Sequence, residues 1–267
     1  MAKTANPPIV FVHGLWLHAD SWGPWVDLFS QRGYAASAPG WPGDAASVEE
    51  TRKNAEQVAG HGIQDVVDHY VETIAMLDAT PIVVGHSFGG LIAQRLLGEG
   101  HAAAGVAIDP APIKGIVYLP PSALRVASVA LRSPGNRNKA VSLSREQFRY
   151  GFGNTLAEEE SDELYEKWTI PSPGKPLFEA AIANFSPGSP AKVQTHDSDR
   201  GPLLVTAGGQ DHTVPAAVSK ATRKRYHKSS AVTDLREFPD RGHSLTVDHG
   251  WREIAESVLA WLKERGL

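Results

Sequence analysis

Short, uninterrupted apolar runs are the feature of this sequence that most restricts its fold. Four of them stand out: Ile9-Val10-Phe11-Val12, Ile82-Val83-Val84, Val106-Ala107-Ile108 and Leu203-Leu204-Val205. A strand with one solvated face would alternate apolar and polar residues, whereas continuous apolarity indicates that both faces are covered. The runs therefore predict buried parallel strands that lie between layers of helices.

Helical patterns fill much of the sequence between these runs. Apolar residues recur at the i, i+3, i+4, i+7 spacing over residues 63–74 and again over residues 251–262. A further strand is predicted over residues 232–238. Because strands and helices alternate along the chain, the predicted class is α/β.

One long segment, residues 120–200, breaks the alternation. Ser144 and Gln147 fit a helical capping box, residues 156–168 are helix-prone, and repeated prolines interrupt the remainder. We predict that this segment is a helical cap inserted into a core domain made of residues 1–119 and 201–267.

Composition excludes several classes of function. The 267 residues include no cysteine, so disulfides, thiolate metal sites and cysteine nucleophiles are excluded. The formal net charge of -4 offers no basic field to nucleic acid. No run reaches the roughly 18 apolar residues of a membrane span, and the first residues lack the apolar segment of a signal peptide. We expect a cytoplasmic protein without a nucleic-acid partner or a membrane span; the oligomeric state stays open.

The candidate nucleophile is Ser87. The sequence Gly85-His86-Ser87-Phe88-Gly89 directly follows a predicted strand and precedes a helical pattern, which is a G-x-S-x-G motif in its strand-to-helix context. The two glycines keep side chains away from the neighbouring backbone while the tight turn exposes the serine. A helix N-terminus also offers backbone N–H groups to a developing negative charge. The alternative is a turn that merely packs a helix on a strand.

An oxyanion hole is predicted beside this turn. His13-Gly14 ends the first strand and would let the following loop approach the nucleophile closely. We assign the backbone N–H groups of Leu15 and Phe88 as the two donors, with Trp16 as the alternative to Leu15. An isolated His-Gly pair could equally be a simple tight turn.

The candidate acid and base follow later strands. Asp211 lies in the loop after the strand that contains Leu203-Leu204-Val205, and His243 lies in the loop before the last predicted helix. Parallel strands present such loops at one edge of their sheet. Asp109 also follows a strand and is the rival acid. We favour Asp211 because of its Gly-Gly-x-Asp-x-x-Val-Pro setting.

With these residues in place, the chain resembles the α/β-hydrolase superfamily over nearly its whole length outside the cap. The order Ser87, Asp211, His243 is the order of that superfamily. The short start, with Trp16 and Trp22 after the His-Gly pair, is similar to the compact branch of plant methylesterases, hydroxynitrile lyases and small bacterial esterases. The resemblance implies an α/β-hydrolase fold with a mostly parallel sheet of about six strands. It also implies acyl transfer from a small, hydrophobic ester without metal or organic cofactor.

Other activities of this fold receive less support. Cyanide-releasing members carry a lysine near the catalytic histidine, whereas Ser244 and Leu245 follow His243 here. Dehalogenases and epoxide hydrolases use an aspartate nucleophile, and Ser87 stands at that place. Carbon–carbon bond cleavage, cofactor-free oxygenation and a non-catalytic receptor role remain open alternatives.

Substrate choice is expected to depend on the cap. Its aromatic residues are Phe148, Tyr150, Phe152, Tyr165, Trp168, Phe178 and Phe185. These rings could line an apolar pocket, although most of them could instead seal the cap onto the core. The candidate substrate-contacting residues are Trp16, Phe148, Phe152, Trp168 and His212.

Overall fold

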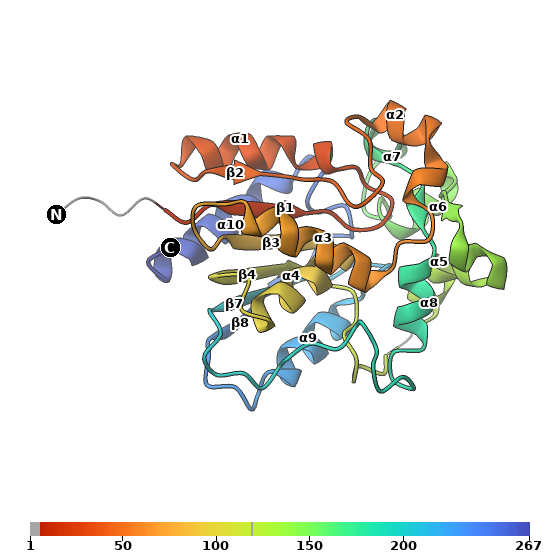
Figure 1. The fold of residues 1–267 in the computed structure, drawn as a ribbon. Helices are drawn as coiled ribbons and strands as arrows, with labels where there is room; N and C mark the ends of the chain where they lie inside the picture. The colour runs from red at the N-terminus through yellow and green to blue at the C-terminus, as the bar shows by residue number, and fades with distance from the viewer. Residues whose placement is uncertain (1–5, 119) are drawn as a thin grey trace.

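A parallel sheet forms the centre of the computed structural model, which describes residues 6–118 and 120–267 (Figure 1). Its six strands lie in the order β2-β1-β3-β4-β7-β8, and every neighbouring pair is parallel. The strands are β1 (Ile9–Val12), β2 (Ala36–Ser37), β3 (Ile82–His86), β4 (Ala104–Ile108), β7 (Leu203–Gly208) and β8 (Thr233–Phe238). The predicted α/β class and the expectation of about six strands are confirmed.

Helices cover both faces of the sheet. On one face, α1 (Gly23–Gln31) and α10 (Trp251–Glu264) pack over Ile9 and Phe11 of β1; on the other, α3 (Ile63–Ala75) and α4 (Phe88–Gly98) pack over Val10 and Val12. The helix α9 (Ala216–Arg225) contributes to the same cluster as α3 and α4. Successive residues of β1 thus enter opposite clusters, which explains its continuous apolarity. Among the described residues, no helix combines the length and apolarity needed to cross a membrane.

Strand register brings the ends of the strands to one edge of the sheet. Val12 of β1 pairs with Gly85 of β3, and His86 pairs with Ile108 of β4. The N–H of Ser87 extends this pairing by donating to the carbonyl of Ile108 at 2.9 Å. The loops that follow β1, β3, β4, β7 and β8 therefore meet at the carboxyl edge, where α/β folds place their sites.

Four helices and a short sheet gather beyond this edge (Figure 1). They are α5 (Pro121–Leu131), α6 (Arg145–Gly151), α7 (Glu158–Trp168) and α8 (Lys175–Ala181), with β5 (Ala140–Val141) antiparallel to β6 (Ser172–Pro173). The capping box of Ser144 and Gln147 starts α6, as predicted. The short helix α2 (Val48–Lys53) lies between β2 and α3 in the chain and contacts this group through Arg52. We call residues 120–200 the cap; its limits stay a prediction, and residues 1–5 and 119 of the predicted core lie outside the described residues.

Candidate active site

Ser87 occupies a strained turn between β3 and α4. Its φ of 56° and ψ of -121° are uncommon for a residue with a side chain, and such strain persists where the surroundings enforce it. The flanking glycines are required sterically, because a Cβ on Gly85 would lie 2.0 Å from the carbonyl oxygen of Gly89. Ser87 itself is only 6% exposed. The turn therefore has the geometry expected of a nucleophile elbow, in a site largely shielded from solvent.

Asp211 and His243 form a buried hydrogen-bonded pair. His243 Nδ1 lies 2.6 Å from Asp211 Oδ2. The other carboxylate oxygen accepts hydrogen bonds from the N–H groups of Thr213 and Val214, both at 2.7 Å. Because the carboxylate accepts from Nδ1, the lone pair of the neutral ring is left on Nε2.

The second nitrogen of His243 is available for proton transfer. Nε2 is buried and has no hydrogen-bond partner within the part of the chain that the structure describes. The ring lies 4.5 Å from the ring of His86, the residue before Ser87, and 4.7 Å from the ring of Phe152. A buried polar atom without a partner is costly in a fold that needs it only for packing. This arrangement suits a general base whose Nε2 is free to accept a proton from a hydroxyl group.

Burial shifts the pKa values of the candidate acid, Asp211, and the candidate base, His243. It lowers the pKa of His243 to about 4, since the imidazolium is poorly solvated there. It raises the pKa of Asp211 to about 7, an effect opposed by the hydrogen bonds that this carboxylate receives. The resting imidazole is therefore neutral. The charge of Asp211 is most stabilising when an imidazolium forms beside it.

Asp109, the rival acid, has different partners. Its carboxyl oxygens accept from the N–H of Gly208 at 3.0 and 3.1 Å and from the hydroxyl of Thr206 at 3.1 Å. Burial raises the pKa of Asp109 well above its usual range, and the adjacent Asp211 raises it further. In this structure Asp211, not Asp109, is the hydrogen-bond partner of His243.

The same three side chains are the group to consider for a metal. Ligand atoms of Asp109, Asp211 and His243 lie within 4.8 Å of one another. Both oxygens of each carboxyl group and Nδ1 of the imidazole already take part in the hydrogen bonds described above. This donor set fits a proton-transfer network better than a cation site.

The loop after β1 approaches Ser87 closely. A Cβ on Gly14 would lie 2.7 Å from the Cβ of Ser87, so only glycine permits this approach. Leu15 follows directly. The N–H of Trp16 donates to the hydroxyl of Ser172 in the cap at 2.6 Å, which leaves Leu15 as the better candidate oxyanion donor.

His13, at the start of this loop, is held by contacts with Asp44 and Trp41. Its Nε2 lies 2.9 Å from a carboxylate oxygen of Asp44, and its ring stacks on Trp41 with centroids 5.3 Å apart. The contacts of Asp44, Trp41 and Ser172 with this loop were not predicted from the sequence. No local motif indicates them, because each contact joins residues far apart in the chain.

Of the candidate substrate-contacting residues, Trp16, Phe148 and Phe152 pack together near His243, whereas His212 lies in a different contact. The ring of Phe152 packs between those of His243 and Trp16, and the centroids of Phe152 and Trp16 lie 6.3 Å apart. Phe152 also stacks on the fully buried Phe148, with centroids 5.0 Å apart. His212 instead packs against Tyr150, with centroids 4.8 Å apart.

Other cap aromatics lie where the cap meets the core or solvent. Trp168 is half-buried beneath the ammonium of Lys167, and its carbonyl accepts the N–H of His18. Phe185 is 87% exposed, so its ring faces solvent.

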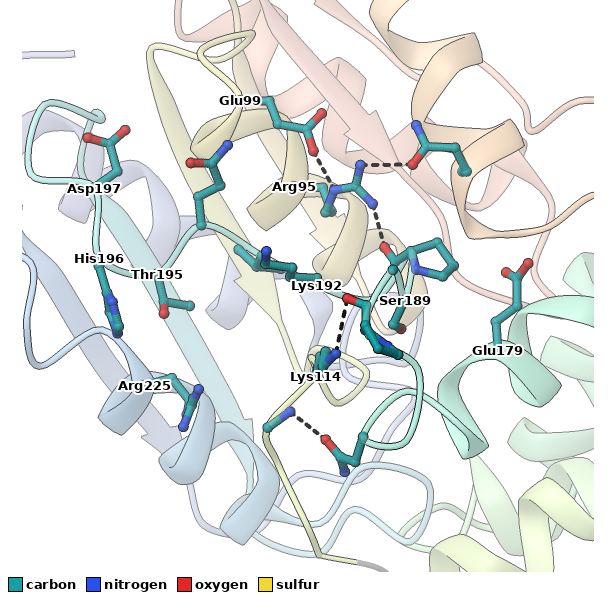
Figure 2. Close-up of a pocket in the computed structure, with 18 residues that line it drawn as sticks. Arg95, Glu99, Lys114, Glu179, Ser189, Lys192, Thr195, His196, Asp197 and Arg225 are labelled. Atoms are coloured by element: carbon teal, nitrogen blue, oxygen red, sulfur yellow. Dashed lines mark hydrogen bonds and ion pairs between the residues drawn. The ribbon is translucent and has the colours of Figure 1, made fainter.

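A large polar pocket lies away from these residues (Figure 2). It has a volume of about 1300 Å³ and is lined by the end of α4, by Lys114, by much of residues 187–197 and by Arg225. Figure 2 shows Arg95 paired with Glu99, and Lys114 donating to the backbone carbonyl of Pro187. The pocket is lined by none of the candidate catalytic residues, so we do not assign it to catalysis.

Comparisons with known proteins agree with this architecture. The sequence profile of the Alpha/beta hydrolase family matches residues 9–257. A relative from Acinetobacter baylyi, (E)-2-((N-methylformamido)methylene)succinate hydrolase, is 25% identical over 257 residues, which cover 96% of this chain and 90% of the relative.

Similar solved structures include three enzymes. A methylesterase from Arabidopsis matches with a TM-score of 0.68 and 15% identity, covering 97% of this chain and 99% of that one. Polyneuridine aldehyde esterase matches with a TM-score of 0.66 and 18% identity over 96% and 98% of the two chains. A monoacylglycerol lipase from Paleococcus ferrophilus matches with a TM-score of 0.67 and 20% identity over 96% and 95%. At these identities the structures show a shared fold.

Proposed function

The chain belongs to the alpha/beta hydrolase family, and from that premise we propose that it is a serine hydrolase that cleaves a small carboxylic ester through Ser87, His243 and Asp211. One observation carries the proposal: His243 is bonded to Asp211 through Nδ1, while its buried Nε2 has no partner among the described residues. The strained turn of Ser87 follows directly after His86, which packs on the same imidazole.

The proposed reaction proceeds by acyl transfer. His243 Nε2 takes the proton of Ser87 Oγ while that oxygen bonds to the ester carbonyl carbon, whose π electrons move to the carbonyl oxygen. The N–H groups of Leu15 and Phe88 stabilise this oxyanion. The intermediate then releases the alkoxide, which takes the proton from His243. Water attacks the acyl-enzyme by the same two steps, and Asp211 stabilises the imidazolium each time.

An apolar ester fits the surroundings of the base. Phe152 of the cap places its aromatic ring beside His243, and the ring of Trp16 packs edge-on against Phe152. The similar solved structures bear the names of a methylesterase, an esterase and a lipase, all of which denote ester cleavage. The Acinetobacter baylyi relative is named for a formamido compound, so an amide should accompany esters in any substrate panel.

The proposal is tested by labelling and turnover. A fluorophosphonate probe should modify the wild-type protein at Ser87, as mapped by mass spectrometry, and short p-nitrophenyl esters should be hydrolysed. Ser87→Ala should lower kcat by at least about 10³-fold, because no acyl-enzyme can form.

A second serine provides the matched control. Ser219 on α9 is also buried, and its hydroxyl has no hydrogen-bond partner within the described residues. Ser219→Ala should therefore keep the wild-type kcat. Turnover of Ser87→Ala within tenfold of wild type, in a folded and uncontaminated preparation, would overturn the proposed mechanism.

A further inference from the structure

A segment of the cap runs antiparallel to the loop that carries the candidate oxyanion donor. We call residues 13–18 the oxyanion loop and residues 168–172 the splint. The N–H of His18 donates to the carbonyl of Trp168, and the N–H of Ile170 donates to the carbonyl of Trp16, both at 3.0 Å. Leu17 and Thr169 form an antiparallel bridge between these contacts. The cap is thus hydrogen-bonded along the oxyanion loop.

Trp16 is the strained residue of this loop. Its φ of 67° is in the left-handed region, which costs a bulky residue roughly 1–2 kcal/mol. Strain of this kind persists only where neighbouring groups enforce it. The core alone does not supply these groups, because three of the hydrogen bonds of Trp16 go to the cap.

The hydrogen bonds of Trp16 come from three places in the cap. Its backbone N–H donates to the hydroxyl of Ser172 at 2.6 Å, its carbonyl accepts from Ile170, and its indole N–H donates to the carbonyl of Val141 at 3.0 Å. Ser172 is 4% exposed, so water cannot readily replace its hydroxyl. Without that acceptor, a buried N–H would lose its partner in a backbone that is already strained.

The splint is itself fixed to the core. Arg52 on α2 donates from Nε to the carbonyl of Thr169 at 2.8 Å and from Nη2 to the carbonyl of Glu166 at 2.8 Å. A cation at the end of α7 is also favoured by the helix dipole. This second attachment keeps Ser172 in register with Trp16.

We propose that Ser172 is a positioning residue for catalysis: by accepting the N–H of Trp16, it holds the preceding residue, Leu15, in the orientation that presents its own N–H to the oxyanion. This proposal rests on the proposed function. It deepens that function by making the oxyanion hole complete only when the cap is seated. On the other side of Leu15, Gly14 lies close to Ser87.

The experiment compares three substitutions in the full chain. Ser172→Ala removes the acceptor. Ser172→Cys keeps the volume but supplies a much weaker acceptor, and Ser172→Thr keeps the hydroxyl. A matched control is Ser161→Ala on α7, because Ser161 is a fully buried cap serine whose hydroxyl has no partner among the described residues.

The readouts separate positioning from folding. Loss of one oxyanion donor costs about 10²–10³-fold in kcat, so its partial misplacement should lower kcat of the Ala and Cys variants about 10–100-fold. KM for p-nitrophenyl butyrate should stay within about threefold. The inhibition constant of a trifluoromethyl ketone, whose adduct carries the oxyanion, should rise in parallel with the loss of kcat. Ser172→Thr and Ser161→Ala should stay within about threefold of wild type.

Two results distinguish this inference from the proposed function. If Ser172→Cys keeps the wild-type melting temperature, kcat and inhibition constant while Ser87→Ala is inactive, the positioning role is wrong and the mechanism stands. If Ser87→Ala is active, the proposed mechanism is wrong, and the positioning role that rests on it is wrong as well. A rise in KM with unchanged kcat and inhibition constant would also overturn the positioning role, since it would assign Ser172 to substrate binding.

Discussion

The crossing of α4 over β1 offers a sharp test of the geometry at Ser87, the proposed nucleophile. Gly89 lies two residues after Ser87, and a Cβ built on it would lie 2.1 Å from the carbonyl oxygen of Val12 and 2.6 Å from that of His13. Real Cβ atoms essentially never come within 3.0 Å of such atoms. Gly89→Ala must therefore displace α4 or the end of β1 by about 1 Å, because backbone groups cannot rotate away as a side chain would.

This displacement should reduce both stability and turnover. Overpacking of this kind costs about 3 kcal/mol at the upper end of its usual range. Each kcal/mol lowers Tm by about 2–4 °C in a domain of roughly this size, so Gly89→Ala should melt roughly 6–12 °C below wild type. A misplacement of about 1 Å near a reacting centre costs on the order of a hundredfold in rate, and kcat should fall by a similar factor.

Gly23→Ala is the matched control. Gly23 opens α1 with helical φ and ψ of -47° and -50°, and nothing lies within 4 Å of a Cβ built there. The substitution should be neutral or should stabilise by about 0.4–1 kcal/mol. Calorimetry and p-nitrophenyl ester turnover measure both variants. If Gly89→Ala melts within 2 °C of wild type and keeps its kcat, helix and strand are not in the close contact described above.

Three further predictions address the acid, the base and the cap. Asp211→Asn should lower kcat roughly a thousandfold or more, and Asp109→Asn far less, since Asp211 and not Asp109 is hydrogen-bonded to His243; a reversed order in folded variants would contradict this assignment. On acidification, kcat/KM should fall with a midpoint between about pH 4 and 6.5, the pKa of free imidazole, because burial lowers the pKa of His243 and so preserves its neutral form. A midpoint at or above 6.5 would show that the imidazole is not desolvated. Phe152→Leu should change relative kcat/KM across an acyl-length series by about 1–3 kcal/mol, whereas Phe185→Leu, at an exposed position, should not; an unchanged ranking of esters for Phe152→Leu would show that this ring does not contact the acyl group.

The central strands could be predicted because burial on both faces requires a continuous run of apolar residues, which can be recognised in the sequence. The runs at Ile9-Val10-Phe11-Val12 and Leu203-Leu204-Val205 fall within β1 and β7. Shorter elements leave no such trace: β2, β5 and β6 have two residues each, too few for any periodicity. Their pairing partners, rather than their own composition, make them strands.

The candidate site could be read from the sequence for a similar reason. A tight turn needs particular residues at fixed offsets, so Ser87 and its flanking glycines form a motif that is visible locally. The partner of Trp16 is different. Ser172 lies 156 residues further along the chain, and its neighbours in sequence give no sign that its hydroxyl meets a strained loop. Only the folded chain brings the two together.

The antiparallel contact between residues 168–172 and residues 16–18 restricts how such an enzyme can be altered. A designer who exchanges the cap to change substrate preference would also remove groups that are hydrogen-bonded to a loop beside Ser87. A chimaera would therefore bind a new ester yet turn it over slowly unless the transplanted segment brought its own acceptor for the tryptophan N–H. For the same reason, we expect substitutions in residues 168–172 to disturb residues 16–18, and we expect α5 and α8 to tolerate more sequence change.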